Sequence, residues 1–317
     1  MTARVAAVDC GTNSIRLLVV ECDADTGEVT ELARQSRIVR LGQGVGRTGR
    51  FAPEALRRTF AACAEFADVI GTLRAERVVF VATSATRDVA ERAEFFAGVE
   101  RILGVVPEVI SGDEEARLSY AGATGSLPAG SGPRLVLDIG GGSTEFVIGT
   151  TEATASVSLN IGSVRLAERY LADATGAVDR ITPEGVAAVR RDIGTALGEA
   201  MTRLPLEPRP ALIGVGGSVT TLAAVRRGTK KGVHGVRLGI DDVRAVGRRL
   251  IEADRAERAA IHVIEPGRVD VIPVGGLILL GVMERLGAPE IVVSRRGLLD
   301  GLVRRLGGRS VPTPSGL

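Results

Sequence analysis

Two acidic residues bracket a glycine turn in the middle of this chain. Asp138 ends a short apolar run, Glu145 begins the next one, and between them lie Gly140, Gly141, Gly142 and Ser143. Apolar runs on both sides of a tight glycine turn predict a β-hairpin. We expect the three glycines to take positive φ angles and expose successive N–H groups to an anion such as phosphate. A divalent cation explains the neighbouring acids, since such ions bind carboxylate and phosphate oxygens together.

A similar hairpin is predicted near the N-terminus. At one constant offset the aligned pairs are Asp9 with Asp138, Gly11 with Gly140, and Ser14 with Ser143. Asn13 lies in the same loop, and Arg16 falls where Glu145 stands in the second copy. A repeat separated by this length predicts duplicated domains. Their two turns would then face each other across one cleft, which is a usual place for a ligand.

Three further groups of residues are candidates for phosphate chemistry. Gly216, Gly217 and Ser218 follow an apolar run and open a predicted helix, whose N-terminus would favour an anion. Glu115 lies in the first turn of another predicted helix, from which a carboxylate could activate water. Arg87 ends a Thr-Ser-x-Thr-Arg loop that offers hydroxyls and a guanidinium to an anion. Glu115 and Arg87 each have a simpler explanation. Acids stabilise the starts of helices whether or not they are catalytic, and arginines are common on surface loops.

The elements around these residues alternate between strands and helices. Predicted strands cover 4–8, 15–21, 29–39, 78–82, 107–110, 134–149 (as a hairpin), 156–159, 211–215 and 291–293. Predicted helices cover 53–73, 89–103, 111–123, 164–171, 183–203, 216–225, 241–261, 273–286 and 297–306.

The segment 124–133 is rich in Gly, Ser and Pro and is the predicted boundary between two domains. The domains would be 1–123 and 124–296. The last helix, 297–306, is free to pack back on the first domain, and 307–317 is a predicted disordered tail.

Composition excludes several classes of protein. A chain of 317 residues is too long for one ordinary core, and a net charge of +2 argues against nucleic-acid binding. Two histidines cannot form a multi-histidine metal site. The three cysteines lack zinc spacing and fit reduced thiols in the cytoplasm. The longest apolar run, near 271–283, is shorter than a membrane span and predicts a buried helix.

The motifs carry a family resemblance that extends from Val5 to about Leu306. In chain order they are VDCGTNSIRLL, ATSATR, VISGDEEARL, VLDIGGGSTEFVIG, NIGSVRL and IGVGGSVTTLAA. This set resembles the exopolyphosphatase and guanosine pentaphosphate phosphatase (Ppx/GppA) family of the actin and sugar-kinase superfamily. The resemblance implies an α/β fold with two RNase-H-like domains facing an interdomain cleft. Longer relatives add a C-terminal HD-type domain that is not expected here. The resemblance therefore does not decide whether this protein forms a homodimer.

The resemblance also implies an activity and a set of site residues. The reaction would be Mg²⁺-dependent removal of the terminal phosphate of inorganic polyphosphate, with Glu115 as general base and Arg87 facing the terminal phosphates. Asp138, Glu145 and Asp9 would hold Mg²⁺, partly through water. The phosphate-binding residues would be Asn13, Ser14, Gly140, Gly141, Gly142, Ser143, Gly216, Gly217 and Ser218. Alternatives are hydrolysis of the 5′-phosphate of guanosine pentaphosphate, a kinase or actin-like ATPase, and a non-catalytic sensor of polyphosphate or guanosine tetraphosphate.

The most basic stretch of the chain lies between two predicted helices. It contains Arg226, Arg227, Lys230, Lys231, His234 and Arg237. Long-range attraction could guide a polyanion to this stretch, and a solvated loop is an equally good explanation.

Overall fold

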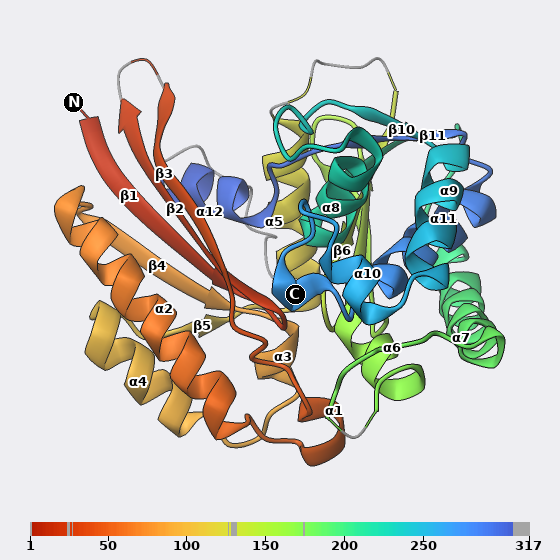
Figure 1. Ribbon diagram of the computed structural model, residues 1–317. Coiled ribbons are helices and arrows are strands. Elements are labelled where there is room, and N and C mark those ends of the chain that lie inside the picture. The colour runs from red at the N-terminus through yellow and green to blue at the C-terminus, as the bar shows by residue number, and fades with distance from the viewer. Residues whose placement is uncertain are drawn as a thin grey trace.

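The computed structural model describes residues 2–23, 26, 28–125, 127, 132–173 and 175–306. Two sheets with helices around them form two lobes that lie side by side (Figure 1). The predicted tail 307–317 and part of the predicted boundary 124–133 lie outside the described residues.

The first sheet has five strands in the order β3-β2-β1-β4-β5. Its antiparallel part consists of β1 (Thr2–Cys10), β2 (Ser14–Asp23) and β3 (Val29–Ile38). The strands β4 (Arg77–Ala82) and β5 (Glu108–Val109) then extend the sheet in parallel from β1.

The second sheet repeats this order. The strands β6 (Arg134–Ile139), β7 (Thr144–Gly149) and β8 (Ala153–Leu159) are antiparallel, and β9 (Ala211–Val215) and β11 (Glu290–Val293) extend the sheet in parallel from β6. Read from β8, the order is β8-β7-β6-β9-β11, with β10 (Arg237–Gly239) added at the edge. The shared order confirms the predicted fold class of two related α/β units. The three-residue strand β10 was not predicted.

The helices follow the predicted pattern with several corrections. The four-residue helix Val45–Thr48 and the 3₁₀ turn Pro266–Arg268 were not predicted, and the helix predicted from residue 89 begins at Ala93. They are α1 (Val45–Thr48), α2 (Pro53–Thr72), α3 (Ser84–Arg87), α4 (Ala93–Leu103), α5 (Gly112–Thr124), α6 (Ser163–Tyr170), α7 (Pro183–Met201), α8 (Gly216–Arg227), α9 (Ile240–Glu252), α10 (Arg255–Ala259), a 3₁₀ turn (Pro266–Arg268), α11 (Ile272–Leu286) and α12 (Leu298–Leu306). The segment 84–87 was predicted as a loop but forms the short helix α3. The segment 241–261 was predicted to be helical throughout, but it divides after Glu252 because Asp254 caps a new helix in a capping box with Glu257.

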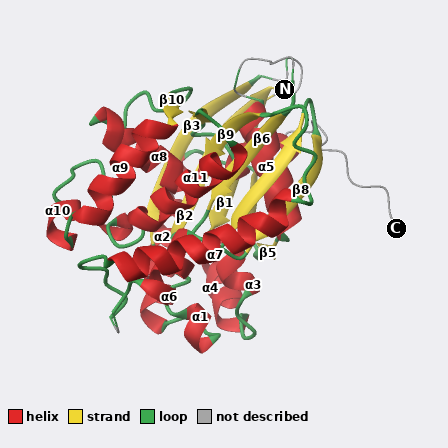
Figure 2. Cartoon of the chain, turned by 90° about the vertical axis from the view of Figure 1, so that its right-hand side faces the viewer, coloured by secondary structure: helices red, strands yellow, loops and turns green. Residues whose placement is uncertain are grey.

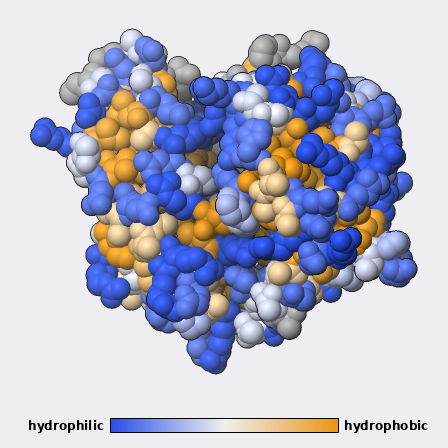
Figure 3. All heavy atoms as spheres, viewed as in Figure 1, coloured by the Kyte–Doolittle hydropathy of each residue, from blue (hydrophilic) through white to orange (hydrophobic). Residues whose placement is uncertain are grey.

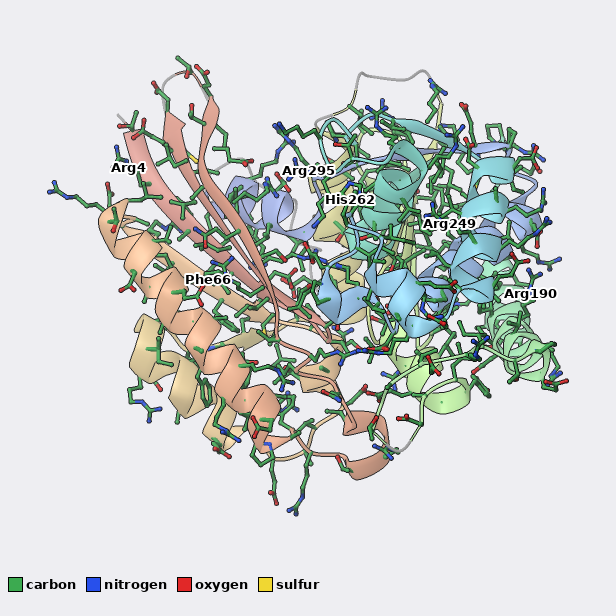
Figure 4. All side chains as sticks on the ribbon, viewed as in Figure 1. Arg4, Phe66, Arg190, Arg249, His262 and Arg295 are labelled. Carbon is green, nitrogen blue, oxygen red and sulfur yellow. The ribbon has the colours of Figure 1, made fainter. Side chains whose placement is uncertain are left out.

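Each sheet has a large core on its outer face. Phe66 points from α2 toward the first sheet, where it joins Phe80 and Phe95 in a buried cluster (Figure 4). On the second sheet α7, α9 and α11 form the outer layer, and α7 and α11 lie in front of the strands in Figure 2. Helix α11 is buried along most of its length, as its apolar sequence predicts. Among the described residues, no helix combines the length and apolar character needed to cross a membrane.

The helices on the inner faces are exchanged between the two halves. Helix α5 follows the first sheet in sequence, but Ala116, Tyr120 and Ala123 pack on the second sheet. Helix α12 follows the second sheet, but Leu298, Leu302 and their neighbours pack on the first sheet. The two helices cross where Gly122 approaches the Gly297 carbonyl and Gly301 approaches the backbone of Leu118, at distances that leave no room for a Cβ. This crossing joins the two lobes.

Candidate active site

The two hairpins place their acids at equivalent positions. Asp9 pairs with Arg16 across β1 and β2, and Asp138 pairs with Glu145 across β6 and β7, each one residue before the last pair of the hairpin. A cavity between the lobes is lined by most of the predicted site residues, namely Asp9, Asn13, Ser14, Glu115, Asp138, Gly140, Gly141, Gly142, Ser143, Gly217 and Ser218. Gly216 lines an adjoining groove. Arg87 and Glu145 do not line the cavity but contact or adjoin residues that do.

The acids from the hairpins are buried and short of positive charge. Burial raises the pKa of Asp9 to about 6, although the Arg16 guanidinium, 3.7 Å away, opposes this shift. Burial also raises the pKa of Asp138, against the charge of Arg16 and a 2.9 Å hydrogen bond from the Ser119 hydroxyl. Burial and the charge of Asp138 raise the pKa of Glu145 to about 7. A bound cation would relieve this shortage of positive charge.

The donor set fits a cation that keeps part of its hydration. Among the described residues, no three Asp, Glu, His or Cys side chains are close enough to enclose a metal by themselves. Mg²⁺ commonly uses only one or two carboxylates and completes its shell with water and phosphate oxygens. Asp9 and Asp138 both line the cavity, whereas Glu145 is buried behind it and accepts a 2.9 Å hydrogen bond from the Ser158 hydroxyl.

Glu115 reaches the cavity from the first helical turn of α5. The Ser111 hydroxyl caps this helix by accepting a hydrogen bond from the Glu114 backbone N–H. The Glu115 carboxylate accepts a hydrogen bond from Arg87 at 3.0 Å, so Arg87 contacts this acid directly. Burial and the nearby acids raise the pKa of Glu115 well above its ordinary value, although Arg87 opposes the shift. Glu114 points elsewhere and bonds Arg305 of α12 at 2.5 Å.

Glycine is required in the second turn for a different physical reason from the one predicted. Of the turn and helix-start glycines, Gly216 has a positive φ, of 86°, whereas Gly140, Gly141 and Gly142 have none. A Cβ at Gly141 would lie 2.9 Å from Thr12 Cβ, and one at Gly142 would collide with the Ser84 hydroxyl. These glycines are therefore required by the close approach of the opposite lobe, and the predicted positive φ angles were wrong.

Asn13 has the unpaired polar atoms expected of a ligand-binding residue. Its side-chain oxygen and nitrogen are both buried, and neither has a hydrogen-bond partner in the structure. The residue is 6% exposed and lines the cavity. Because buried amides are normally paired, this side chain is free to bond a ligand or water in the cavity.

Two arginines that were not predicted as site residues, Arg16 and Arg268, also line the cavity. Arg16 stands at the position equivalent to Glu145, which was the only indication that the sequence offered. Arg268 ends the 3₁₀ turn, and its guanidinium lies so close to Gly217 that a Cβ there would collide with it. No sequence pattern marked Arg268, because its position depends on the packing of a distant turn against α8.

A groove of about 250 Å³ continues from the cavity between the lobes. It shares Arg16, Asp138 and Arg268 with the cavity, and its wall adds Arg295 and Arg296. The surface is hollowed between the lobes in Figure 3, and Figure 4 shows Arg295 in the same region.

The basic stretch contributes one side chain to this groove. Lys230 lines the groove and pairs with Glu265 at 3.4 Å. Arg226 pairs with Asp242, and Arg237 pairs with Glu290, on the surface. These two arginines therefore behave as parts of a solvated surface.

The whole chain is similar to known phosphatases. Exopolyphosphatase 2 of Mycobacterium tuberculosis is 43% identical over 320 residues, covering 96% of this chain and 99% of the relative. The crystal structure of a Ppx/GppA family member from Aquifex aeolicus is 29% identical with a TM-score of 0.79, and covers 99% of this chain and 100% of its own. An exopolyphosphatase from Cytophaga hutchinsonii is 25% identical with a TM-score of 0.88, and covers 98% and 100%.

The family model for these proteins matches residues 18–308 of this chain, which include α5, the second sheet, the second glycine turn and the first sheet from within β2 onward. With its duplicated acid-and-glycine hairpins and its full-length similarity to M. tuberculosis Exopolyphosphatase 2, this chain belongs to the Ppx/GppA phosphatase family.

Proposed function

We propose that this protein is an exopolyphosphatase that hydrolyses the terminal phosphoanhydride bond of inorganic polyphosphate and releases orthophosphate. The observation that carries the proposal is the cavity in which Glu115 faces two hairpin turns, each with a buried acid at the same strand position. The similarity to exopolyphosphatases along nearly the whole chain supports the same substrate class.

We infer that the cavity binds Mg²⁺ together with the terminal phosphates. Asp138 and Asp9 would hold the ion from opposite lobes, with Glu145 supporting it from behind and water filling the remaining positions. The ion would neutralise charge on the phosphate oxygens. Backbone N–H groups of the glycine turn and the side-chain amide of Asn13 would bond the same oxygens. Ser218 would bind phosphate from the first turn of α8, where the helix N-terminus also favours an anion.

Glu115 acts as the general base in this proposal. Its raised pKa makes its carboxylate a stronger base than an ordinary glutamate while Arg87 favours the ionised form. The carboxylate would take a proton from water as that water attacks the terminal phosphorus, and the bond from that phosphorus to the bridging oxygen would break, which leaves orthophosphate and a polyphosphate one unit shorter. Arg87 would hold Glu115 in place through this step and offset part of the negative charge.

The rest of the polyphosphate chain would lie along the groove. Arg16 and Arg268 belong to both spaces, so they would meet the phosphates next to the cleaved bond. Arg295 and Arg296 lie farther along the groove and would interact with later phosphates. Such contacts between exposed charges weaken as the salt concentration rises.

The test is phosphate release from polyphosphates of several lengths in Mg²⁺, with guanosine pentaphosphate and ATP as competing substrates. Polyphosphate should be hydrolysed from its end, and Glu115→Gln should lower kcat by about 10²–10⁴-fold. Glu114→Gln is the matched control, because Glu114 is adjacent to Glu115 in sequence but its carboxylate bonds Arg305 of α12. Release from guanosine pentaphosphate alone, or near-normal activity of Glu115→Gln, would overturn the proposal.

We also propose a cytoplasmic location. Cys10, Cys22 and Cys63 are all buried free thiols, as expected in a reducing compartment.

A further inference from the structure

Helix α6 fixes the glycine turn from behind. The backbone N–H of Ser163 donates to the Gly140 carbonyl at 3.0 Å, and the N–H groups of Val164 and Arg165 donate to the Gly141 carbonyl at 2.8 and 3.0 Å. In a trans peptide the carbonyl and the next N–H point in opposite directions. Anchoring these carbonyls on α6 therefore turns the following N–H groups away from α6.

The third carbonyl of the turn is held by a side chain. Arg165 Nε donates to the Gly142 carbonyl at 2.7 Å, which turns the N–H of Ser143 away from α6 in the same way. A second nitrogen of the same guanidinium pairs with Asp88, in the opposite lobe. Asp88 directly follows Arg87 and is the C-cap residue of α3. One planar side chain thus contacts both the glycine turn and the C-cap of the helix that carries Arg87.

We propose that Arg165 is a positioning residue that sets the glycine turn in register with the Arg87–Glu115 pair across the cleft. This inference rests on the proposed function for its substrate, but the contacts it describes do not depend on that substrate. The guanidinium is suited to the task, because its rigid fork can hold two acceptors at a fixed angle. A short displacement of the turn relative to the attacking group is enough to lower the rate strongly.

Neighbouring residues supply matched controls. Glu168 also faces the opposite lobe and accepts a hydrogen bond from the Gly44 N–H at 3.1 Å. Arg169 lies one turn after Arg165 but pairs with Asp192 of α7, within its own lobe, at 2.7 Å. Arg169→Ala therefore removes an Arg–Asp pair from the same helix and leaves the bonds of Arg165 to Gly142 and Asp88 in place.

The experiment compares kcat and KM for polyphosphate across these variants. Arg165→Ala should lower kcat by about 10²-fold with a smaller change in KM. Arg165→Lys should not rescue the rate, since a lysine keeps the charge but lacks the fork. Asp88→Asn should cost less, and the double variant should be no worse than Arg165→Ala alone, because both act through one contact. Arg169→Ala should match the wild type.

A second measurement separates this inference from the proposed function. Hydrogen–deuterium exchange in the absence of substrate should quicken in segments 139–145 and 84–89 of Arg165→Ala and Arg165→Lys, and remain unchanged in Arg169→Ala. Should the wild type fail to hydrolyse polyphosphate, the proposed function falls while the exchange result still tests Arg165. Unchanged exchange in both segments, or full rescue of kcat by lysine, would overturn the positioning role.

Discussion

Arg87 Nη1 donates to Glu115 Oε2 at 3.0 Å, and the same nitrogen donates to the Ile110 carbonyl at 2.9 Å. The second bond ties the guanidinium to the backbone just before α5, so Arg87 is fixed relative to the helix start that carries Glu115. The pair therefore behaves as one unit, in which the arginine influences both the position and the pKa of the carboxylate.

Removing the charge of Arg87 should shift the pH dependence of the reaction. Arg87 opposes the raised pKa of Glu115, so Arg87→Gln should raise that pKa further. Since the base acts in its ionised form, the acidic limb of the kcat/KM profile should move to higher pH. Arg87→Lys keeps a cation and should move the limb less. A limb that stays in place in Arg87→Gln would show that Glu115 does not govern it.

A methyl group on the glycine turn should interfere with closure of the two lobes. The Cβ of Gly142→Ala would collide with Ser84 and lie 2.9 Å from the Thr12 hydroxyl, both in the opposite lobe. Overpacking of this kind should lower the free energy of unfolding by about 1–3 kcal/mol and raise KM for polyphosphate. Gly46→Ala is the control, because no atom lies within 4 Å of a Cβ there. Equal effects of the two substitutions would contradict this explanation of the glycine.

The metal-free protein should lose stability as the pH rises from about 4 to about 7. Burial raises the pKa of Asp9 to about 6 and that of Glu145 to about 7, so in this range the folded state binds more protons than the unfolded state. The free energy of unfolding therefore falls with rising pH. Denaturant unfolding in EDTA across this range measures the slope, and Glu145→Gln should reduce it. Added Mg²⁺ should restore stability at pH 7 and above if the acids bind it.

The crossing of α5 and α12 should tolerate no added side-chain atom. Gly122→Ala or Gly301→Ala would place a Cβ against the backbone of the partner helix, which cannot move aside as a flexible side chain can. We expect a loss of at least about 1–3 kcal/mol in unfolding free energy. Gly194→Ala, in α7 with open space around it, should be neutral or stabilising. A calorimetric melt of the three variants would compare them directly.

The sequence predicted local structure better than contacts between the lobes. Apolar runs and turns were sufficient to predict both hairpins, because these depend on neighbouring residues. The break after Glu252 was readable from the capping box of Asp254 and Glu257, which the helical pattern around it obscured. The strand β10 has only Leu238 buried and follows a basic, glycine-containing loop, so it carried too little pattern to be recognised.

Which residues line the cleft depends on packing between distant segments, and no local sequence pattern predicts that packing. Gly142 is a glycine because Ser84 of the other lobe lies against it. Arg268 reaches the cavity from a turn that lies more than one hundred residues after Glu145 in the sequence. The role of Arg165 likewise follows from its contacts with Gly142 and Asp88, which lie far apart in the chain.

Because α5 and α12 are exchanged, each lobe depends on a helix from the other half of the chain to cover the inner face of its sheet. Cleaving the chain between residues 124 and 134 would leave the N-terminal piece without α12 and its sheet bare on one side, while the C-terminal piece would lack α5. A nicked molecule should accordingly remain a single particle, and either piece expressed alone should be insoluble until the other is supplied.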